Sequence, residues 1–228
     1  MITTHGSRQF MKALSPQQTG KHASWAYAEA RPVEDDVLLM ARDRSAELGI
    51  TPISEGTASL LTLLSAAARP QTMVELGTGA GVSGLALMRG APDGAVLTTL
   101  DPDAEAQRAA REVFGAEGYP SSTTRLIAGR GRTVLPKLSA RAYDLVFIDA
   151  DPLLLEYHVT EAARLLRSGG MIIIHDALDQ DRVPKPAVRE AATVMLRDIG
   201  NELRDNTKVW RTSTLVPTGT GLLLATKH

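Results

Sequence analysis

A glycine-rich stretch, Val74-Glu75-Leu76-Gly77-Thr78-Gly79-Ala80-Gly81, is the part of the sequence best suited to hold a ligand. A turn of this kind after the first strand of a parallel sheet brings backbone N–H groups close to a bound molecule and points a helix N-terminus at it. Glycine turns also have purely structural uses, and this spacing, continued to Gly84, is compatible with a dinucleotide fingerprint. The turn therefore predicts a ligand site without identifying the ligand.

Two carboxylates narrow the choice of ligand. Glu75 ends the strand two positions before Gly77, where it would repel a pyrophosphate but can attract a cationic amino group, such as that of S-adenosylmethionine, directly or through water. Asp101 ends the second strand-like run, 26 residues later, and can accept hydrogen bonds from both hydroxyls of a ribose. NAD and adenosylmethionine sites share that feature. The alternative is that Asp101 is the N-cap of a helix over 103–118.

Further carboxylates follow the fourth and fifth strand-like runs, at Asp149, Asp151 and Asp176. Ligands of an open parallel sheet sit outside the carboxyl ends of its strands, so these acids are expected near the glycine turn. Asp149 and Asp176 together can hold a divalent cation such as Mg²⁺, while Asp151 can reach the cofactor. The alternative is that one or two of them only cap the following helix or turn.

The elements that must position these residues alternate along the chain. Strands are predicted over 72–76, 96–100, 124–128, 145–148 and 171–175, with helical segments near 81–90, 102–117, 130–139 and 152–167. A last helix near 187–201 precedes two more strands, over 208–216 and 220–226, that Pro217-Thr218-Gly219 separates. The pattern predicts an α/β fold: a doubly wound, mostly parallel sheet with an antiparallel C-terminal hairpin.

The N-terminal part of the chain is predicted to be additional to this sheet. Residues 1–20 are polar and unpatterned, which is typical of a mobile extension. Residues 21–50 are predicted to form a helical cap, with helical patterns over 24–30 and 34–48. The main domain then spans 51–228, and its first helix follows the capping residue Ser54 and stops at Pro70.

Composition excludes several classes of protein. The 228 residues carry a net charge of −1 with scattered Lys and Arg, so no basic face for nucleic acid is predicted. There is no cysteine, which excludes disulfides, thiolate metal sites and a cysteine nucleophile and suits a reducing cytoplasm. The apolar runs are far shorter than the about 20 residues that cross a bilayer, and no signal-peptide pattern opens the chain, so no membrane association is expected.

From about Thr51 to the C-terminus the chain resembles the small O-methyltransferases that include the catechol and caffeoyl-CoA O-methyltransferases and bacterial relatives. The resemblance is carried by Glu75-Leu76-Gly77, by Gly81-Val82-Ser83, by residues 165–170 and, most specifically, by Tyr143 to Asp151. It implies the Rossmann-like methyltransferase fold with seven strands, a homodimer, the cofactor S-adenosyl-L-methionine and a small phenolic or catechol-like acceptor. The implied cofactor-binding residues are Thr51, Glu75, Gly77, Thr78, Ser83, Asp101, Gly131 and Arg132, the last two beside the adenine, and Asp151 near the methionine end.

Two departures from that family affect the chemistry. Metal-dependent members carry Asp-Asn after the fifth strand, where this chain has Asp176-Ala177, so Asp149 and Asp176 remain as metal ligands without the third. The lysine that other members use as general base is replaced by Pro152. Asp149 is left as the candidate catalytic residue. His175 is a possible base by its chemistry, but if Asp176 faces the site, strand alternation predicts that His175 faces away.

Three other functions are weighed against methyl transfer. An NAD-dependent oxidoreductase would use the glycine turn and Asp101 equally well, but Glu75 opposes it and no Tyr-x-x-x-Lys pair is present. A nucleic-acid methyltransferase is opposed by the charge balance and by Asp149-Ala150-Asp151-Pro152-Leu153, which lacks an aromatic clamp. A non-catalytic, adenosylmethionine-binding dimer is the third alternative, because Ala177 and Pro152 remove the family's metal and base.

Overall fold

The computed structural model describes residues 16–228, and the part of the predicted mobile extension before residue 16 lies outside them. The chain is helical from Pro16, within the last five residues of the predicted extension. The helices are α1 (Pro16–Glu29), α2 (Asp36–Glu47), α3 (Glu55–Ala68), α4 (Val82–Gly90), α5 (Ala104–Ala116), α6 (Gly131–Val134), α7 (Leu155–Leu165) and α8 (Ala191–Asp205), with short 3-10 helices η1 (Leu135–Lys137) and η2 (Pro152–Leu154). None of these helices is long and apolar enough to cross a membrane.

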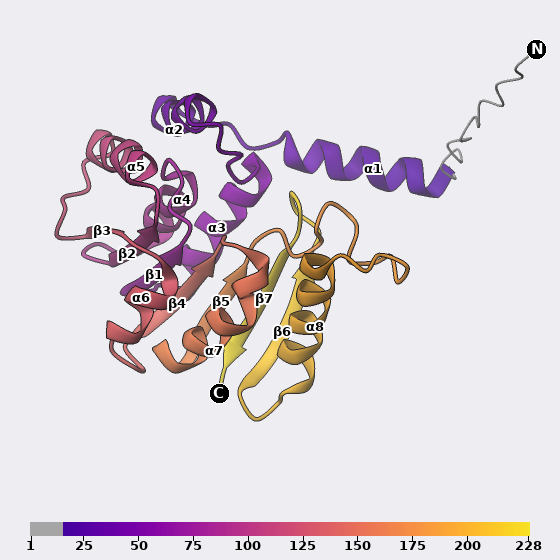
Figure 1. The fold of residues 1–228 in the computed structure, drawn as a ribbon. Helices are drawn as coiled ribbons and strands as arrows, with labels where there is room; N and C mark the ends of the chain where they lie inside the picture. Colours follow the sequence, from indigo (N-terminus) through magenta and orange to yellow (C-terminus); the bar gives the residue numbers. More distant parts are fainter. Residues whose placement is uncertain (1–15) are drawn as a thin grey trace, which may run out of the picture.

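One sheet of seven strands forms the centre of the molecule (Figure 1). Its strands are β1 (Thr72–Leu76), β2 (Val96–Asp101), β3 (Thr124–Ala128), β4 (Tyr143–Ile148), β5 (Leu166–Ile174), β6 (Trp210–Val216) and β7 (Leu222–Lys227). Their order is β3-β2-β1-β4-β5-β7-β6, in which β1 to β5 run parallel and β7 is antiparallel to both neighbours. The predicted doubly wound sheet with an antiparallel C-terminal hairpin is confirmed.

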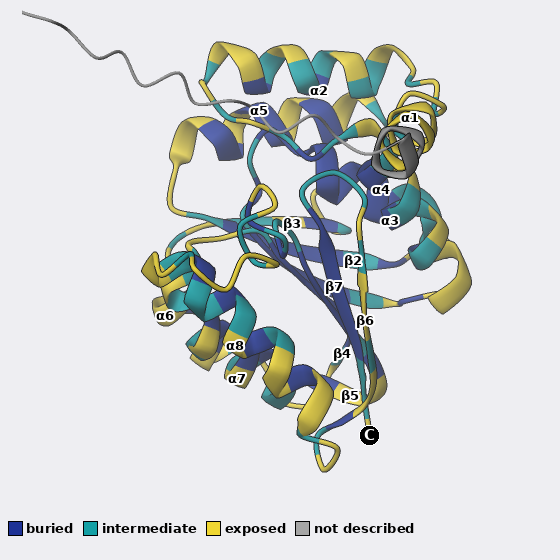
Figure 2. Ribbon diagram, turned by 90° about the vertical axis from the view of Figure 1, so that its right-hand side faces the viewer, coloured by how far each residue is buried: buried dark blue, intermediate teal, exposed yellow. Residues whose placement is uncertain are grey.

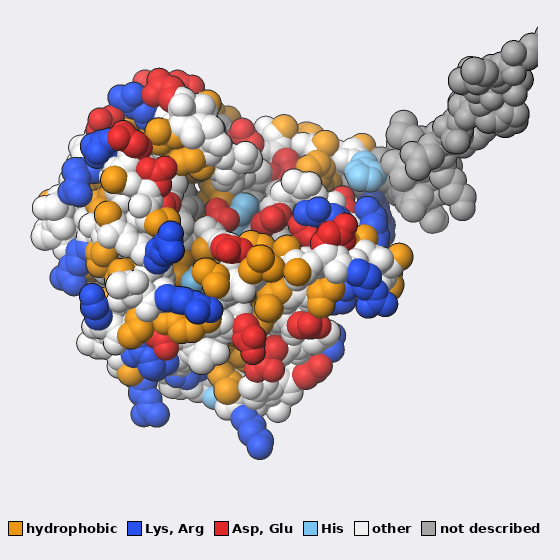
Figure 3. Space-filling model, in the orientation of Figure 1, with side chains coloured by type: hydrophobic (Ala, Val, Ile, Leu, Met, Phe, Trp, Pro, Cys, Tyr) orange, Lys and Arg blue, Asp and Glu red, His pale blue; other side chains and the backbone are white. Residues whose placement is uncertain are grey.

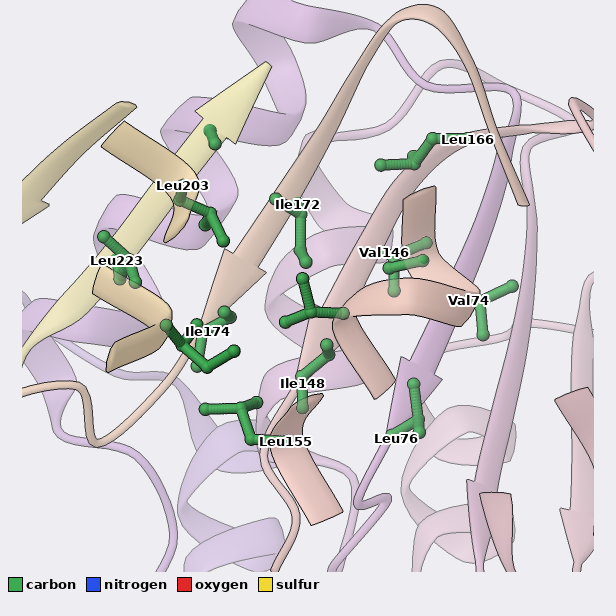
Figure 4. Close-up of a cluster of buried hydrophobic side chains, with 14 of the residues drawn as sticks. Val74, Leu76, Val146, Ile148, Leu155, Leu166, Ile172, Ile174, Leu203 and Leu223 are labelled. Atoms are coloured by element: carbon green, nitrogen blue, oxygen red, sulfur yellow. The ribbon is translucent and has the colours of Figure 1, made fainter. Parts of the chain in front are cut away.

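Helices cover both faces of the sheet, and alternate side chains of each strand feed two separate cores. Val74 and Leu76 of β1 point toward α7 and α8, while Met73 points toward α3 and α4. Figure 2 shows buried strands between these two helical layers, and Figure 4 shows the first core in detail. Because both faces of the sheet are buried, the sequences of the parallel strands are continuous apolar runs.

Several element boundaries differ from those predicted. β5 begins at Leu166, earlier than the predicted 171, because Tyr143 of β4 pairs with Leu166 before a register irregularity. The last helix covers Ala191–Asp205 and is shifted toward the C-terminus of its predicted range. The capped helices of the N-terminal part form as expected: Asp35 accepts from the N–H of Leu38 and Ser54 from that of Thr57, both at 3.1 Å.

The register of the central strands brings the carboxyl ends of β1, β4 and β5 to one level. Leu76 pairs with Ile148, and Ile148 pairs with Ile174. At the opposite end, Asp144 joins β4 to the start of β1 by accepting from the backbone N–H of Gln71 at 2.6 Å and of Thr72 at 2.9 Å. The residues that follow Leu76, Ile148 and Ile174 therefore meet at one edge, where the predicted site lies.

Candidate active site

The glycine turn between β1 and α4 approaches the end of β4 too closely to allow a side chain. Gly77, Gly79 and Gly81 all have positive φ, and a Cβ at Gly77 would overlap the carbonyl oxygen of Asp149. Gly81 is the N-cap of α4 and makes no side-chain cap. Only glycine adopts these left-handed backbone conformations without strain, and it has no side chain to cover the backbone. The turn can therefore bring its backbone N–H groups close to a ligand, as predicted.

Glu75 lies behind this turn rather than in the wall of a cavity. Its side chain is fully buried, and its two carboxylate oxygens accept from the hydroxyls of Ser83 and Thr99, each at 2.6 Å. Burial raises the pKa of Glu75 to about 7, although the two hydroxyl donors favour the ionised form. The sequence suggested that Glu75 attracts a cofactor's amino group directly or through water; here both of its oxygens are bonded to hydroxyls and it lines neither cavity. Glu75 instead holds the start of α4 against β2.

Asp101 lies at the floor of the site. Its Oδ2 accepts from the backbone N–H of Gly79 at 3.1 Å, and its Oδ1 accepts from that of Asp103 at 2.9 Å. The capping residue of α5 is Asp103, which accepts from Glu105 N–H at 2.8 Å. The alternative that Asp101 is the helix cap is therefore wrong. Asp101 is fixed in orientation and keeps lone pairs for the ligand, since each carboxylate oxygen can accept more than one hydrogen bond.

Two neighbouring cavities form one continuous cleft over the carboxyl ends of β1, β2 and β4, because both are lined by Gly77, Asp101 and Asp149. The first, of about 300 Å³, also contains the predicted residues Thr51, Thr78 and Ser83. The second, of about 670 Å³, contains the predicted Gly131, Arg132 and Asp151. All the predicted cofactor-binding residues except Glu75 thus line one cleft, which we call the cofactor cleft. Such volumes are usual for ligand sites.

The two ends of the cofactor cleft differ in chemistry. The end with Gly131 and Arg132 is closed by apolar side chains and by His158, whose pKa is lowered chiefly by burial. The Arg132 guanidinium lies 5.4 Å from the centre of the Tyr157 ring, which fixes its direction. Asp151 lies at this same end and caps η2 by accepting from Leu153 N–H at 2.9 Å. It lines the half of the cleft with Gly131 and Arg132, not the half with Thr51 and Ser83.

Sequence reasoning missed several residues of the cleft. Ile50, Pro52 and Ile53, in the segment between α2 and α3, line the first cavity with Thr51. Leu100 and Leu154 line the second. None of these residues has a reactive group, so no local signal distinguishes them from ordinary core or loop positions. Their contribution is to exclude water from the cofactor cleft.

Asp149 and His175 are hydrogen-bonded partners, contrary to the expectation that His175 points away. Asp149 Oδ1 lies 3.0 Å from His175 Nδ1, and His175 Nε2 lies 3.3 Å from the Thr220 hydroxyl. The pairing of Ile148 with Ile174 explains the error, because the next residues in register are Asp149 and His175, not Asp176. Burial lowers the pKa of His175, but the hydrogen bond and charge of Asp149 and the charge of Asp176 outweigh burial and raise it.

The predicted metal site at Asp149 and Asp176 does not fit the side chains present. Ala177, at the position of the third ligand, is 4% exposed and offers no donor. Asp149 Oδ1 is already engaged by His175, and Asp176 itself has a positive φ of 55° and one buried, unpaired oxygen. Within residues 16–228 no three His, Cys, Asp or Glu side chains are grouped to bind a metal ion. Two carboxylates make a poor octahedral site, so the side chains present here do not fit a divalent cation.

A third cavity, of about 580 Å³, lies under α1 and is separate from the cofactor cleft. Its walls are Trp25 and its neighbours on α1, Leu178 and its neighbours after β5, and Pro217 and Thr220 at the turn between β6 and β7. Glu29 fastens α1 to this turn, since its Oε1 accepts from the Thr218 hydroxyl and from Gly219 N–H, both at 2.8 Å. We call this space the α1 cavity. Its largely apolar lining suits a ring system.

Acidic side chains dominate the surface around the site. Figure 3 shows carboxylates gathered at a hollow in the middle of the face that α1 overhangs. The cofactor cleft contains Asp101, Asp103, Asp149 and Asp151, against Arg130 and Arg132 at its far end. A ligand with a positive charge near Asp149 is favoured electrostatically, and a pyrophosphate over Gly77 is not. Fold and cleft together define an α/β enzyme of the Rossmann-like methyltransferase type.

Comparison with known proteins agrees with that class. A model of the O-methyltransferase family matches residues 34–228. A Mycobacterium ulcerans relative is 42% identical over 202 residues, 89% of each chain, and a "Probable O-methyltransferase" of Mycobacterium tuberculosis is 40% identical over 212 residues, 93% of this chain and 94% of that one. The chain belongs to the O-methyltransferase family, as the sequence predicted, and is an S-adenosylmethionine-dependent methyltransferase by class. This membership decides against the oxidoreductase alternative.

Solved structures share the fold over nearly the whole chain. A protein from Corynebacterium glutamicum superposes with a TM-score of 0.82 at 30% identity, covering 91% of this chain and 97% of that one. The O-methyltransferase TomG from Streptomyces achromogenes, involved in tomaymycin synthesis and solved in complex with SAM, gives 0.80 at 23% identity, covering 94% and 99%. The second likeness establishes the fold only.

Proposed function

We propose that the protein transfers the methyl group of S-adenosylmethionine to a phenolic hydroxyl of a small acceptor. The observation that carries the proposal is Asp101, which the Gly79 N–H and Asp103 N–H hold at the junction of the two halves of the cofactor cleft. A carboxylate fixed in this way is suited to both hydroxyls of a ribose. The adenine then occupies the end with Gly131, and the methionine part lies over Gly77 toward Ser83.

The proposed polarity of the cofactor follows from charge and shape. The second half of the cleft is larger and has apolar walls with a neutral imidazole, which suits a purine ring. The first half is narrower and lined by Thr51, Thr78 and Ser83, which suits the amino acid part. Asp149 lines both halves, so its carboxylate lies where the sulfonium would be and favours that positive charge.

The acceptor is proposed to enter through the α1 cavity. Trp25, Leu178 and Pro217 offer apolar surface for an aromatic ring, and Thr220 extends from this cavity to the His175 that contacts Asp149. Methyl transfer from a sulfonium is an in-line displacement on an activated carbon, so holding the two reactants in line in a dry site supplies much of the rate. A catechol's second hydroxyl is not required, because the side chains do not fit a chelating metal.

The assembly and cellular location belong to the same proposal. Tyr27, Val33 and Leu63 are large apolar side chains exposed on α1, on the following segment and on α3. Burying them between two copies would give the homodimer expected from the family resemblance. A chain without cysteine is suited to the reducing cytoplasm, where we place the enzyme.

Calorimetric titration with adenosylhomocysteine and, separately, with NADH tests the cofactor. We expect saturable binding of adenosylhomocysteine and none of NADH, since a pyrophosphate would face Asp101 and Asp149. Incubation with labelled adenosylmethionine and a panel of phenols, catechols and carboxylates then tests the acceptor. Binding of NADH alone contradicts the proposal, while tight cofactor binding without transfer to any acceptor would favour the non-catalytic alternative.

A further inference from the structure

A hydrogen-bonded chain connects the cofactor cleft with the α1 cavity. Asp149 lines the cofactor cleft, Thr220 lines the α1 cavity, and His175 bonds to both, at 3.0 Å and 3.3 Å. The His175 side chain is only 11% exposed, so it lies between the two spaces rather than on an open surface. His175 is thus one residue from each space: Thr220 separates it from the α1 cavity, and Asp149 separates it from the cofactor cleft.

The direction of the chain follows from the chemistry of its members. Asp149 as a carboxylate only accepts hydrogen bonds, so the ring nitrogen that faces it, Nδ1, carries the proton. Nε2 of the neutral ring then has the free lone pair, and it is the atom that faces Thr220. A carboxylate behind a histidine fixes the tautomer of the ring and stabilises the imidazolium that forms when Nε2 takes a proton.

The other groups expected to assist an acceptor hydroxyl are missing or badly placed. Pro152 stands where the family's lysine base would be, and Ala177 removes a metal ligand. The remaining basic side chains around the α1 cavity are Lys21 and His22. Both are exposed on α1, and neither is hydrogen-bonded to Asp149, His175 or Thr220. His175 is thus the base that the fold holds in a defined orientation by a second residue.

We propose that His175, oriented by Asp149, is the general base of the methyl transfer, and that no divalent cation is needed. This inference rests on the proposed function. The acceptor hydroxyl donates its hydrogen bond to Nε2 and takes the place of the Thr220 hydroxyl, which lies 3.3 Å from that nitrogen. As the acceptor oxygen forms its bond to the methyl carbon, the O–H proton moves to Nε2 and the S–CH₃ bond breaks, so that the sulfonium becomes a neutral thioether. The imidazolium beside Asp149 later returns the proton to water.

The test measures kcat with phenols of graded acidity: 4-methylphenol, phenol, 4-cyanophenol and 4-nitrophenol. His175→Asn is the informative variant, because its amide can still donate to Asp149 but has no lone pair in place of Nε2. We expect about a 100-fold loss or more with the weakly acidic phenols. The loss should shrink toward none with phenols that are already ionised, because these need no base. His228→Asn changes an exposed histidine that lines neither the cofactor cleft nor the α1 cavity; it is the matched control and should change kcat less than about threefold.

Several results would overturn the inference. A loss that is equal for all four phenols would make His175 a structural residue, and full activity of His175→Asn would exclude it as the base. A loss graded with phenol acidity in Lys21→Ala would assign the role to that lysine. Activity abolished by a chelator and restored by Mg²⁺ would restore the metal mechanism. If the wild type methylates none of the phenols, the inference and the phenolic acceptor class fail together.

Calorimetry with adenosylhomocysteine separates this inference from the proposed function. Wild type and His175→Asn should bind it with the same affinity, because His175 lines neither half of the cofactor cleft. Intact binding with kinetics that do not depend on phenol acidity would reject only the base. Absence of binding to the wild type would reject the proposed function itself.

Discussion

Replacing Glu75 by glutamine is expected to remove a strong pH dependence from the stability of the protein. Glu75 is fully buried between β1, β2 and α4, and burial raises its pKa from the ordinary 4.5 to about 7. The folded protein therefore binds this proton more tightly than the unfolded chain does. The stability due to Glu75 is fully present below pH 4.5, is lost as the pH rises to about 7, and is level above that.

The size of the effect follows from the two pKa values. At 1.36 kcal/mol for each tenfold change in proton affinity, the difference between 4.5 and about 7 corresponds to about 3 kcal/mol. Most of this loss falls between pH 5 and pH 8. Glutamine is nearly isosteric and does not titrate, and its amide can donate to one of the two hydroxyls, Ser83 and Thr99, while it accepts from the other.

The assay is urea unfolding of wild type and Glu75→Gln at pH 5, 6, 7 and 8. The free energy of unfolding of the wild type minus that of the variant should fall by about 2 to 3 kcal/mol across this range. The contribution of His175 is common to both proteins and cancels. Glu156→Gln, which changes an exposed carboxylate on α7, is the matched control and should give a constant difference. A constant or rising difference for Glu75→Gln would refute the reasoning.

Three further predictions concern the cofactor cleft and α1. Gly77→Ala should weaken adenosylhomocysteine binding at least tenfold in calorimetry, whereas Gly94→Ala, also at positive φ but in open space, should leave the affinity unchanged. Asp101→Asn should weaken the same binding by about 10-fold to 100-fold, as for a charged hydrogen bond worth about 1.5–3 kcal/mol, and equal affinity would contradict the ribose contact. Glu29→Ala should lower the free energy of unfolding by about 1–3 kcal/mol in urea and raise the acceptor KM, because α1 loses its bonds to the β6–β7 turn; an unchanged KM would argue against acceptor binding there.

The sequence by itself was sufficient for the class of fold and for most of the cofactor cleft. Apolar runs separated by helices of regular length predict a parallel sheet, because a crossover needs a helix between parallel strands. Glycines after the first strand and acids after the second and fourth are placed by that topology alone. The sequence alone predicted that Gly77, Asp101 and Asp149 lie at one edge of the sheet, because the carboxyl ends of parallel strands meet at the same edge.

The tertiary structure alone decided which side chains face one another at that edge. Asp149 meets His175 rather than Asp176, since the register of β4 on β5 pairs Ile148 with Ile174. Register between strands that are distant in the sequence depends on how two cores pack, and no local pattern records it. Glu75 is a second example. Its place in the sequence predicted contact with a ligand, but side-chain alternation along β1 buries it behind the glycine turn, where it accepts a hydrogen bond from Ser83. The residues of the cofactor cleft thus follow from local sequence patterns, whereas the Asp149–His175 pair depends on contacts that only the folded chain creates.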